Sequence, residues 1–207
     1  MDMGKQIYVV FSSTPYKIGK MIRTVTGEKY NHASIALDEN LTQMYSFARR
    51  YQKTPLYGGF VRETSARYCR KGKRASMKIY KLDVEDARYE ALKQKLEDMY
   101  QNKEDYLYNH LSALAVFLHK SIQPKNAYTC VEFCVAVLHD LGLPVNPGTY
   151  YSIGDLMTVL EPNLHYTGPI PHACCKDAEY RAKKPLPHPV LSSAKSIAVL
   201  LPRLKKS

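Results

Sequence analysis

The stretch that decides the fold is NAYTCVEFC, residues 126–134, because it sets a cysteine at the start of an apolar run. The run continues as VAVLHDLGLP, where a glycine and then a proline end the apolar pattern, so we predict a helix over Thr129–Leu141. Cys130 then lies in the first turn of this helix and Cys134 one turn deeper. We expect the first thiol to lie at the mouth of the helix and the second to pack in the core.

The first turn of a helix suits a reactive thiol. Its unpaired backbone N–H groups and the helix dipole stabilise a thiolate, and the N–H of Cys130 can help to bind an oxyanion. Glu132, two residues further on, points elsewhere on the helix, which favours a salt bridge or a cap over acid catalysis. A nucleophilic thiol also needs a base, which other parts of the chain must supply.

A histidine is the natural base for such a thiol. The chain has seven: His32, His110, His119, His139, His165, His172 and His188. His32 begins a predicted strand, a rigid place from which a side chain can face a helix N-terminus. His139 lies at the wrong end of the helix, and His110 and His119 fit core or helix-end roles. His32 is therefore the predicted partner of Cys130.

Hydrophobic patterning predicts strands early in the chain and helices late. The expected strands cover Lys5–Ser12, His32–Asp38, Gln43–Ala48, Phe60–Glu63, Ser76–Asp83 and Leu164–Ile170. The expected helices follow Pro15 as far as Gly27 and cover Glu85–Tyr100, Leu107–His119, Thr129–Leu141 and Ile153–Leu160. The helix over Leu107–His119 is apolar on most sides, so we expect it to be central. This order predicts an α+β fold with an antiparallel sheet packed against helices.

Length and composition indicate one domain with a basic extension. The chain has 207 residues and 45% apolar composition, enough for a core. We predict a catalytic domain over residues 1–175 and a proline-containing extension over 176–207. The apolar stripe of the extension can dock on the domain, the commoner fate, or lie in a lipid interface.

Five cysteines without regular spacing are a poor disulfide framework, so we expect reduced thiols and a cytoplasmic protein. The N-terminal apolar run Ile7–Phe11 is a strand rather than a signal peptide. The Leu107–His119 segment is too short and polar to span a bilayer. The cluster Pro171–Cys175 lacks the ligand spacing of a zinc site, and no nucleotide motif is present, so we expect neither metal nor cofactor.

The formal net charge of +11 favours anionic partners or a solubilising surface. Arg62–Lys81 holds eight basic residues and one acid, Glu63, while Arg181–Ser207 holds seven basic residues and no acid. An anionic surface or lipid fits this charge. Because no nucleic-acid module is visible, we expect no specific nucleic-acid partner.

The motifs YNHASIALD, MYSFARR, GGFVRE and YTCVEFCVAVLHDLGLP, in that order, resemble the permuted NlpC-type papain-like superfamily, in particular its YiiX/YebB-like branch of bacterial proteins. Lecithin–retinol acyltransferases are distant relatives of that branch. The resemblance covers roughly residues 5–170 and implies a circularly permuted papain-like fold, in which the histidine strand precedes the cysteine helix. His32–Ile35 and Cys130–Phe133 match the two motifs of the family, which implies that Cys130 is the nucleophile and His32 the general base.

Two positions depart from the family pattern. Val131 stands where a serine is usual, which we expect to change packing rather than chemistry. Such enzymes also orient the histidine with a polar residue on the following strand, where Ser46 is the one polar candidate of useful size, although it gives the imidazolium no charge. Tyr128, two residues before the cysteine, is expected to line the site together with the backbone of Cys130.

The resemblance implies a cysteine hydrolase that cleaves a small amide or peptide substrate through an acyl-enzyme. A lipid acyl hydrolase or acyltransferase at a membrane surface is the first alternative, favoured by the basic stretches. A non-catalytic binding protein of the same fold is the second, because the third residue of the site is weak.

Overall fold

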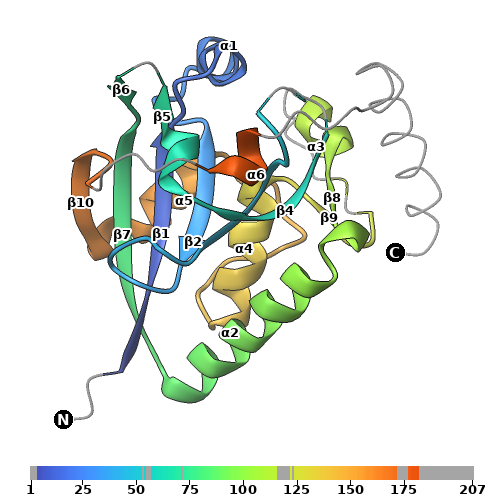
Figure 1. Cartoon of the computed structure of the whole chain (residues 1–207). Helices are drawn as coiled ribbons and strands as arrows, with labels where there is room; N and C mark the ends of the chain where they lie inside the picture. Colours follow the sequence, from blue (N-terminus) through green and yellow to red (C-terminus); the bar gives the residue numbers. More distant parts are fainter. Residues whose placement is uncertain are drawn as a thin grey trace.

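The structure of the chain, a computed structural model, describes residues 4–52, 54, 57–70, 72–115, 122, 124–171 and 177–181. It is an α+β fold in which helices pack against one large sheet (Figure 1). The sheet contains β1 (Lys5–Ser13), β2 (His32–Ala36), β3 (Met44–Arg49), β4 (Gly58–Glu63), β7 (Ser76–Val84), β8 (Leu107–Tyr108), β9 (Ala127–Tyr128) and β10 (Leu164–Pro169). The strand order is β10-β7-β1-β2-β3-β4-β8-β9.

The remaining elements connect or cover this sheet. A separate two-stranded ribbon consists of β5 (Cys69–Arg70) and β6 (Lys73–Arg74). The helices are α1 (Lys17–Thr26), α2 (Asp86–Gln101), α3 (His110–Ala115), α4 (Cys130–Asp140), α5 (Ile153–Leu160) and α6 (Ala178–Arg181). The described residues also form the 3-10 turns η1 (Ser65–Tyr68), η2 (Lys103–Asp105) and η4 (Glu161–Asn163).

Alternation along the strands separates two cores. In β1, Ile7, Val9 and Phe11 belong to the larger core, which includes apolar residues of α2, α4 and α5. The intervening Tyr8 and Val10 belong to a smaller core on the other face, with side chains from η1, β7 and the residue after β10. Because both faces of the central strands are covered, the register of β2 is fixed, and with it the position of His32.

The edge of the sheet differs from the prediction. All pairs from β10 to β8 are antiparallel, but β8 and β9 are parallel, so the sheet is mixed. The prediction of a single helix over Leu107–His119 is also wrong at its start. Leu107 pairs with Gly59 and Ala127, and the helix begins only at His110.

A side chain accounts for this late helix start. The Asn109 Oδ1 accepts a hydrogen bond from the Ser112 N–H at 3.1 Å, as an N-cap does. Leu107 and Tyr108, which precede Asn109, therefore lie outside the helix and pair as strand β8. Residues 116–121, at the end of the predicted helix, lie outside the described part of the chain.

The described part of the predicted extension packs on the domain. Tyr180 in α6 is only 2% exposed, and its carbonyl accepts a hydrogen bond from the Gln52 N–H at 2.8 Å. The Thr64 hydroxyl donates to Asp177 at 2.7 Å. Residues 177–181 thus contact the domain, whereas the apolar stripe on which the docking prediction rests lies outside the described residues.

The cysteines are not all reduced, contrary to the prediction. Cys69 is disulfide-bonded, whereas Cys130 and Cys134 are free. Cys174 and Cys175 lie outside the described residues. A disulfide at Cys69 removes the argument from reduced thiols for a cytoplasmic location.

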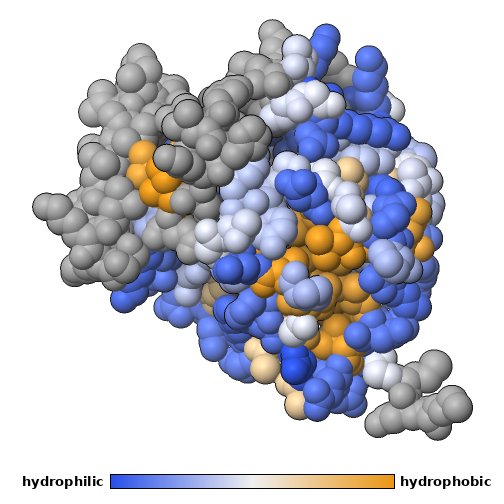
Figure 2. All heavy atoms as spheres, turned by 180° about the vertical axis from the view of Figure 1, so that it is seen from behind, coloured by the Kyte–Doolittle hydropathy of each residue, from blue (hydrophilic) through white to orange (hydrophobic). Residues whose placement is uncertain are grey.

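Among the residues that the structure describes, none of the helices has the length and apolar character needed to cross a membrane. Figure 2 shows an apolar area on the back of the molecule, surrounded by hydrophilic side chains. The most exposed large apolar side chains of the described residues are Val159 in α5 and Leu164 at the start of β10.

Candidate active site

The N-terminus of α4 is held by a reciprocal cap. The Thr129 hydroxyl accepts a hydrogen bond from the Glu132 N–H at 3.2 Å, and the Glu132 carboxylate accepts one from the Thr129 N–H at 2.7 Å. The same carboxylate accepts a bond from the Asn109 amide at 3.1 Å. Glu132 is therefore a capping residue, as predicted, and the cap fixes Cys130 as the first residue of the helix.

The two thiols of α4 differ as the sequence predicted. Burial raises the pKa of Cys134 well above its usual range, and this side chain is fully buried in the core. Cys130 is 7% exposed in the first helical turn, where its backbone N–H has no acceptor within the helix. Of these two thiols, only Cys130 combines a helix N-terminal position with the neighbourhood of a histidine.

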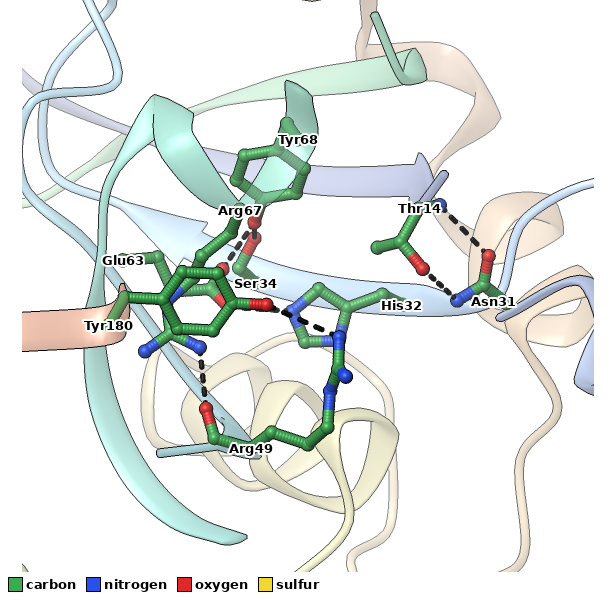
Figure 3. A network of polar contacts seen from close by, with 9 residues as sticks. All are labelled: Thr14, Asn31, His32, Ser34, Arg49, Glu63, Arg67, Tyr68 and Tyr180. Carbon is green, nitrogen blue, oxygen red and sulfur yellow. Dashed lines mark hydrogen bonds and ion pairs between the residues drawn. The ribbon is translucent and has the colours of Figure 1, made fainter. Parts of the chain in front are cut away.

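That histidine is His32, the first residue of β2, which pairs with Ser12 of β1. Its ring is almost fully buried, and its Nε2 lies 3.0 Å from Oε1 of Glu63 (Figure 3). The His32 ring also forms a side-chain hydrogen bond with Cys130, which raises the pKa of the imidazole. Because Nε2 faces Glu63, Nδ1 is the ring nitrogen left for the thiol.

Glu63 is the carboxylate of this arrangement, at the end of β4 and 1% exposed. The Tyr68 hydroxyl donates a hydrogen bond to its Oε2. The same hydroxyl lies 3.4 Å from Oγ of Ser34, the residue two positions after the histidine. Figure 3 shows His32, Glu63 and Tyr68 as one connected network of side chains.

The electrostatics favour a charged pair inside the protein. Burial lowers the pKa of His32, but the charge of Glu63 and the hydrogen bonds with Cys130 and Glu63 raise it, to about 10. Burial raises the pKa of Glu63, but the charge and hydrogen bond of His32, the charge of Arg67 and the Tyr68 hydroxyl lower it, to about 2. At neutral pH the two groups are an imidazolium and a carboxylate.

Ser46 does not orient His32, and this prediction needs correction. Its hydroxyl is buried and has no hydrogen-bond partner in the described structure. The orienting group comes from one strand further along, since Glu63 of β4 reaches the ring. The sequence held a signal for this residue, because Glu63 is the one acid in the basic segment Arg62–Lys81.

Tyr128 is partly buried and packs against the core, and its role in lining a substrate pocket stays a prediction. Its ring packs on Phe47, with centroids 5.1 Å apart, in a cluster that includes Phe60 and Phe133. Tyr108, its parallel partner in β8, is the tyrosine near the thiol. Burial and the charges of Cys130 and Glu132 raise the pKa of Tyr108 above its usual range. The sequence pattern predicted a helix at Tyr108, so this residue was not identified as a neighbour of the thiol.

The other described histidines have partners of their own. The His110 ring packs on Tyr108 with centroids 5.0 Å apart, the His139 side chain is 56% exposed, and the His165 Nε2 lies 3.3 Å from Oε1 of Glu39. Three more histidines, at 119, 172 and 188, are outside the described residues. Within the described ranges, no cluster of three His, Cys, Asp or Glu side chains suits a metal ion.

The described residues thus bring a thiol, an imidazole and a carboxylate into one chain of contacts. In such a chain the carboxylate fixes the ring, the ring exchanges a proton with the thiol, and the helix N-terminus faces the developing negative charge. Comparison of the chain with family models, curated proteins and solved structures found no match.

Proposed function

We propose that the protein is a cysteine hydrolase that cleaves an amide or peptide bond through an acyl-enzyme. The observation that carries the proposal is the buried contact of 3.0 Å between His32 Nε2 and Glu63 Oε1, with Cys130 as the other hydrogen-bonding neighbour of the ring. Cys130 is the nucleophile, His32 transfers protons, and Glu63 is the third residue. A sequence order with the histidine strand before the cysteine helix supports a circularly permuted papain-like fold.

The charged His32–Glu63 pair suggests how the reaction starts. The thiol proton passes to the His32 ring, which Glu63 stabilises as an imidazolium, and the Cys130 sulfur attacks the substrate carbonyl as a thiolate. The carbonyl oxygen becomes an oxyanion near the Cys130 backbone N–H. When this tetrahedral intermediate collapses, the C–N bond breaks, the imidazolium gives its Nδ1 proton to the leaving amine, and a thioester remains.

The second half of the reaction reverses the proton flow. The neutral His32 ring takes a proton from water, whose oxygen attacks the thioester carbonyl. Collapse of the second intermediate breaks the C–S bond, releases the acid and restores the thiolate–imidazolium pair. Glu63 stabilises the imidazolium at both stages and keeps Nδ1 directed at the sulfur.

A thiol-labelling experiment tests the proposal. We expect iodoacetamide at neutral pH to alkylate Cys130 faster than Cys134 in the folded protein, as mapped by mass spectrometry. Release of amine from a pool of peptide amides should disappear in Cys130→Ala and persist in Cys134→Ala. Faster labelling of Cys134, or hydrolysis that survives in Cys130→Ala, would rule out the assignment.

The same experiment separates the alternative functions. A reactive Cys130 without amidase activity, but with release of fatty acid from anionic vesicles, would identify a lipid acyl hydrolase. A Cys130 that is no more reactive than a buried thiol would point to a binding protein.

A further inference from the structure

A second candidate site lies beside β4, where Arg67 belongs both to the pocket wall and to the surroundings of Glu63. It is a pocket of about 100 Å3, which has room for more than one water molecule. Its walls come from β4, η1, the end of α2, η2 and α6. Four cationic side chains line it: Arg50, Arg62, Arg67 and Lys103.

The two acids in the pocket wall already have partners. The Asp177 carboxylate accepts hydrogen bonds from the Thr64 hydroxyl at 2.7 Å and the Tyr180 N–H at 2.8 Å. Glu104 forms an ion pair with Arg50. The lining holds four cationic side chains against these two acids. The excess of positive charge would be balanced by a bound anion.

Two of the arginines are buried and have an unused donor. Arg50 and Arg67 are each 8% exposed, and the Nε of each is buried without a hydrogen-bond partner in the described structure. A buried N–H of a cation that lacks an acceptor is costly, so native proteins rarely leave one without a ligand or water.

The guanidinium groups are also held in place by their other atoms. Arg50 donates to the backbone carbonyls of Lys103 and Tyr106. A Cβ at Gly59 would come within 2.9 Å of Arg50 Nη2, so the glycine gives this guanidinium room. Arg67 donates to the Arg49 carbonyl at 2.6 Å and lies over the Tyr180 ring, 4.2 Å from its centroid. Figure 3 shows Arg49, Arg67 and Tyr180 close together beside Glu63.

We propose that this pocket binds a small oxoanion, a phosphate or a carboxylate group, through Arg50 and Arg67, with Arg62 at its rim. The planar guanidinium presents paired N–H donors that match the oxygens of such groups. The exposed Arg62 side chain lies over the Tyr100 ring, 4.9 Å from its centroid, where it can approach a bound anion. The proposal does not depend on the hydrolase function.

Calorimetric titration of the full chain with inorganic phosphate, and separately with acetate, at constant ionic strength tests the proposal. We expect saturable binding of at least one of the two anions, weakened about tenfold in Arg50→Gln because one charge-assisted donor group is lost. Arg62→Gln, which removes an exposed side chain and should leave the fold intact, is expected to weaken binding several-fold. Arg88→Gln is the matched control, since Arg88 is exposed, lies on α2 and does not line the pocket.

Each result bears on the proposal. Saturable binding of phosphate alone identifies a phosphate site, and saturable binding of acetate alone identifies a carboxylate site. If Arg50→Gln does not fold, the comparison of Arg62→Gln with Arg88→Gln decides. An absence of saturable binding, or equal loss of affinity in Arg62→Gln and Arg88→Gln, would overturn the proposal.

Discussion

Glu63, the residue that contacts the His32 ring opposite the thiol, determines how strongly His32 holds its proton. A serine at this position would fix the ring but would not stabilise its charge, whereas Glu63 does both from a buried position. The Tyr68 hydroxyl and the charge of Arg67 keep the carboxylate ionised despite its burial. The reactivity of Cys130 is therefore expected to depend on Glu63 more than on any other residue outside the thiol–imidazole pair.

Replacement of Glu63 by Gln is expected to lower the rate of any hydrolysis by about 10²–10⁴-fold, the range over which a positioned acid–base group acts. The amide keeps the shape of the side chain but removes the charge that stabilises the imidazolium. Turnover and the rate of Cys130 alkylation are the measurements. Ser46→Ala is the control, because its hydroxyl makes no hydrogen bond to any described residue and its loss should leave both rates unchanged. A large effect of Ser46→Ala with no effect of Glu63→Gln would contradict our assignment.

The same pair makes stability depend on pH. The pKa of His32 is raised from 6.5 to about 10, so its contribution is complete below pH 6.5 and is lost as the pH rises towards 10. The pKa of Glu63 is lowered from 4.5 to about 2, so its contribution is complete above pH 4.5 and is lost as the pH falls towards 2.

We therefore expect the free energy of unfolding to differ most between the wild type and Glu63→Gln from pH 4.5 to 6.5. Breaking a buried ion pair costs about 3–5 kcal/mol, and this difference should shrink at both pH extremes. Urea titrations across the pH range measure it. A difference that stays constant with pH would show that the two groups are not charged partners.

At the scale of elements, the cap of α4 places the thiol. Among the described helices, two have the same reciprocal cap, Thr129 with Glu132 in α4 and Ser152 with Asp155 in α5. Removing either cap is expected to cost a similar amount of stability. Only the Thr129 cap adjoins Cys130, so a comparison of the two variants separates an effect on the thiol from an effect on stability.

Thr129→Ala and Ser152→Ala are each expected to cost about 1 kcal/mol of stability, the usual effect of losing an N-cap. Only Thr129→Ala should also slow alkylation of Cys130, because it loosens the turn that holds the sulfur against His32. Chemical denaturation and labelling rates are the two readouts. Equal labelling rates in the two variants would mean that the cap does not position the thiol.

The sequence predicted the elements that carry His32 and Cys130 because their signals are local. A Thr–x–x–Glu capping box before an apolar run marks the start of α4, and alternation of apolar residues marks β2. Glu63 stands out in the sequence as the one acid of a basic segment, but its contact with His32 depends on which strands become neighbours, and no local pattern encodes that. Tyr108 was missed for a related reason: pairing with β9 overrides the helical pattern of Leu107–His119.

For the whole molecule, α6 links the extension to the body. The Tyr180 ring lies under the Arg67 guanidinium, and its hydroxyl accepts a hydrogen bond from Arg49 at 3.2 Å. Residues 177–181 contact the domain and form one wall of the proposed anion pocket, while docking of the rest of the extension stays a prediction.

Tyr180→Ala is expected to destabilise the protein by about 3 kcal/mol, as loss of a buried aromatic side chain commonly does. It should also weaken anion binding, because Arg67 loses the ring that supports it. Thermal unfolding and calorimetry measure the two effects. Arg181→Ala, on the same helix and exposed, is the control and should be neutral. Unchanged stability in Tyr180→Ala would mean that α6 contributes little to the fold.

The strand order has a consequence for how the protein folds. The neighbouring strands β1 and β7 join residues such as Ser13 and Ser76, which are 63 positions apart, and β10 adds to β7 from still later in the chain. Such high contact order predicts folding in milliseconds to seconds rather than microseconds. During synthesis, β2 and β4 emerge long before α4, so His32 and Glu63 can meet before Cys130 is made. The contact between His32 and Cys130 is then completed only when α4 docks, so its formation is expected to be a late event in folding.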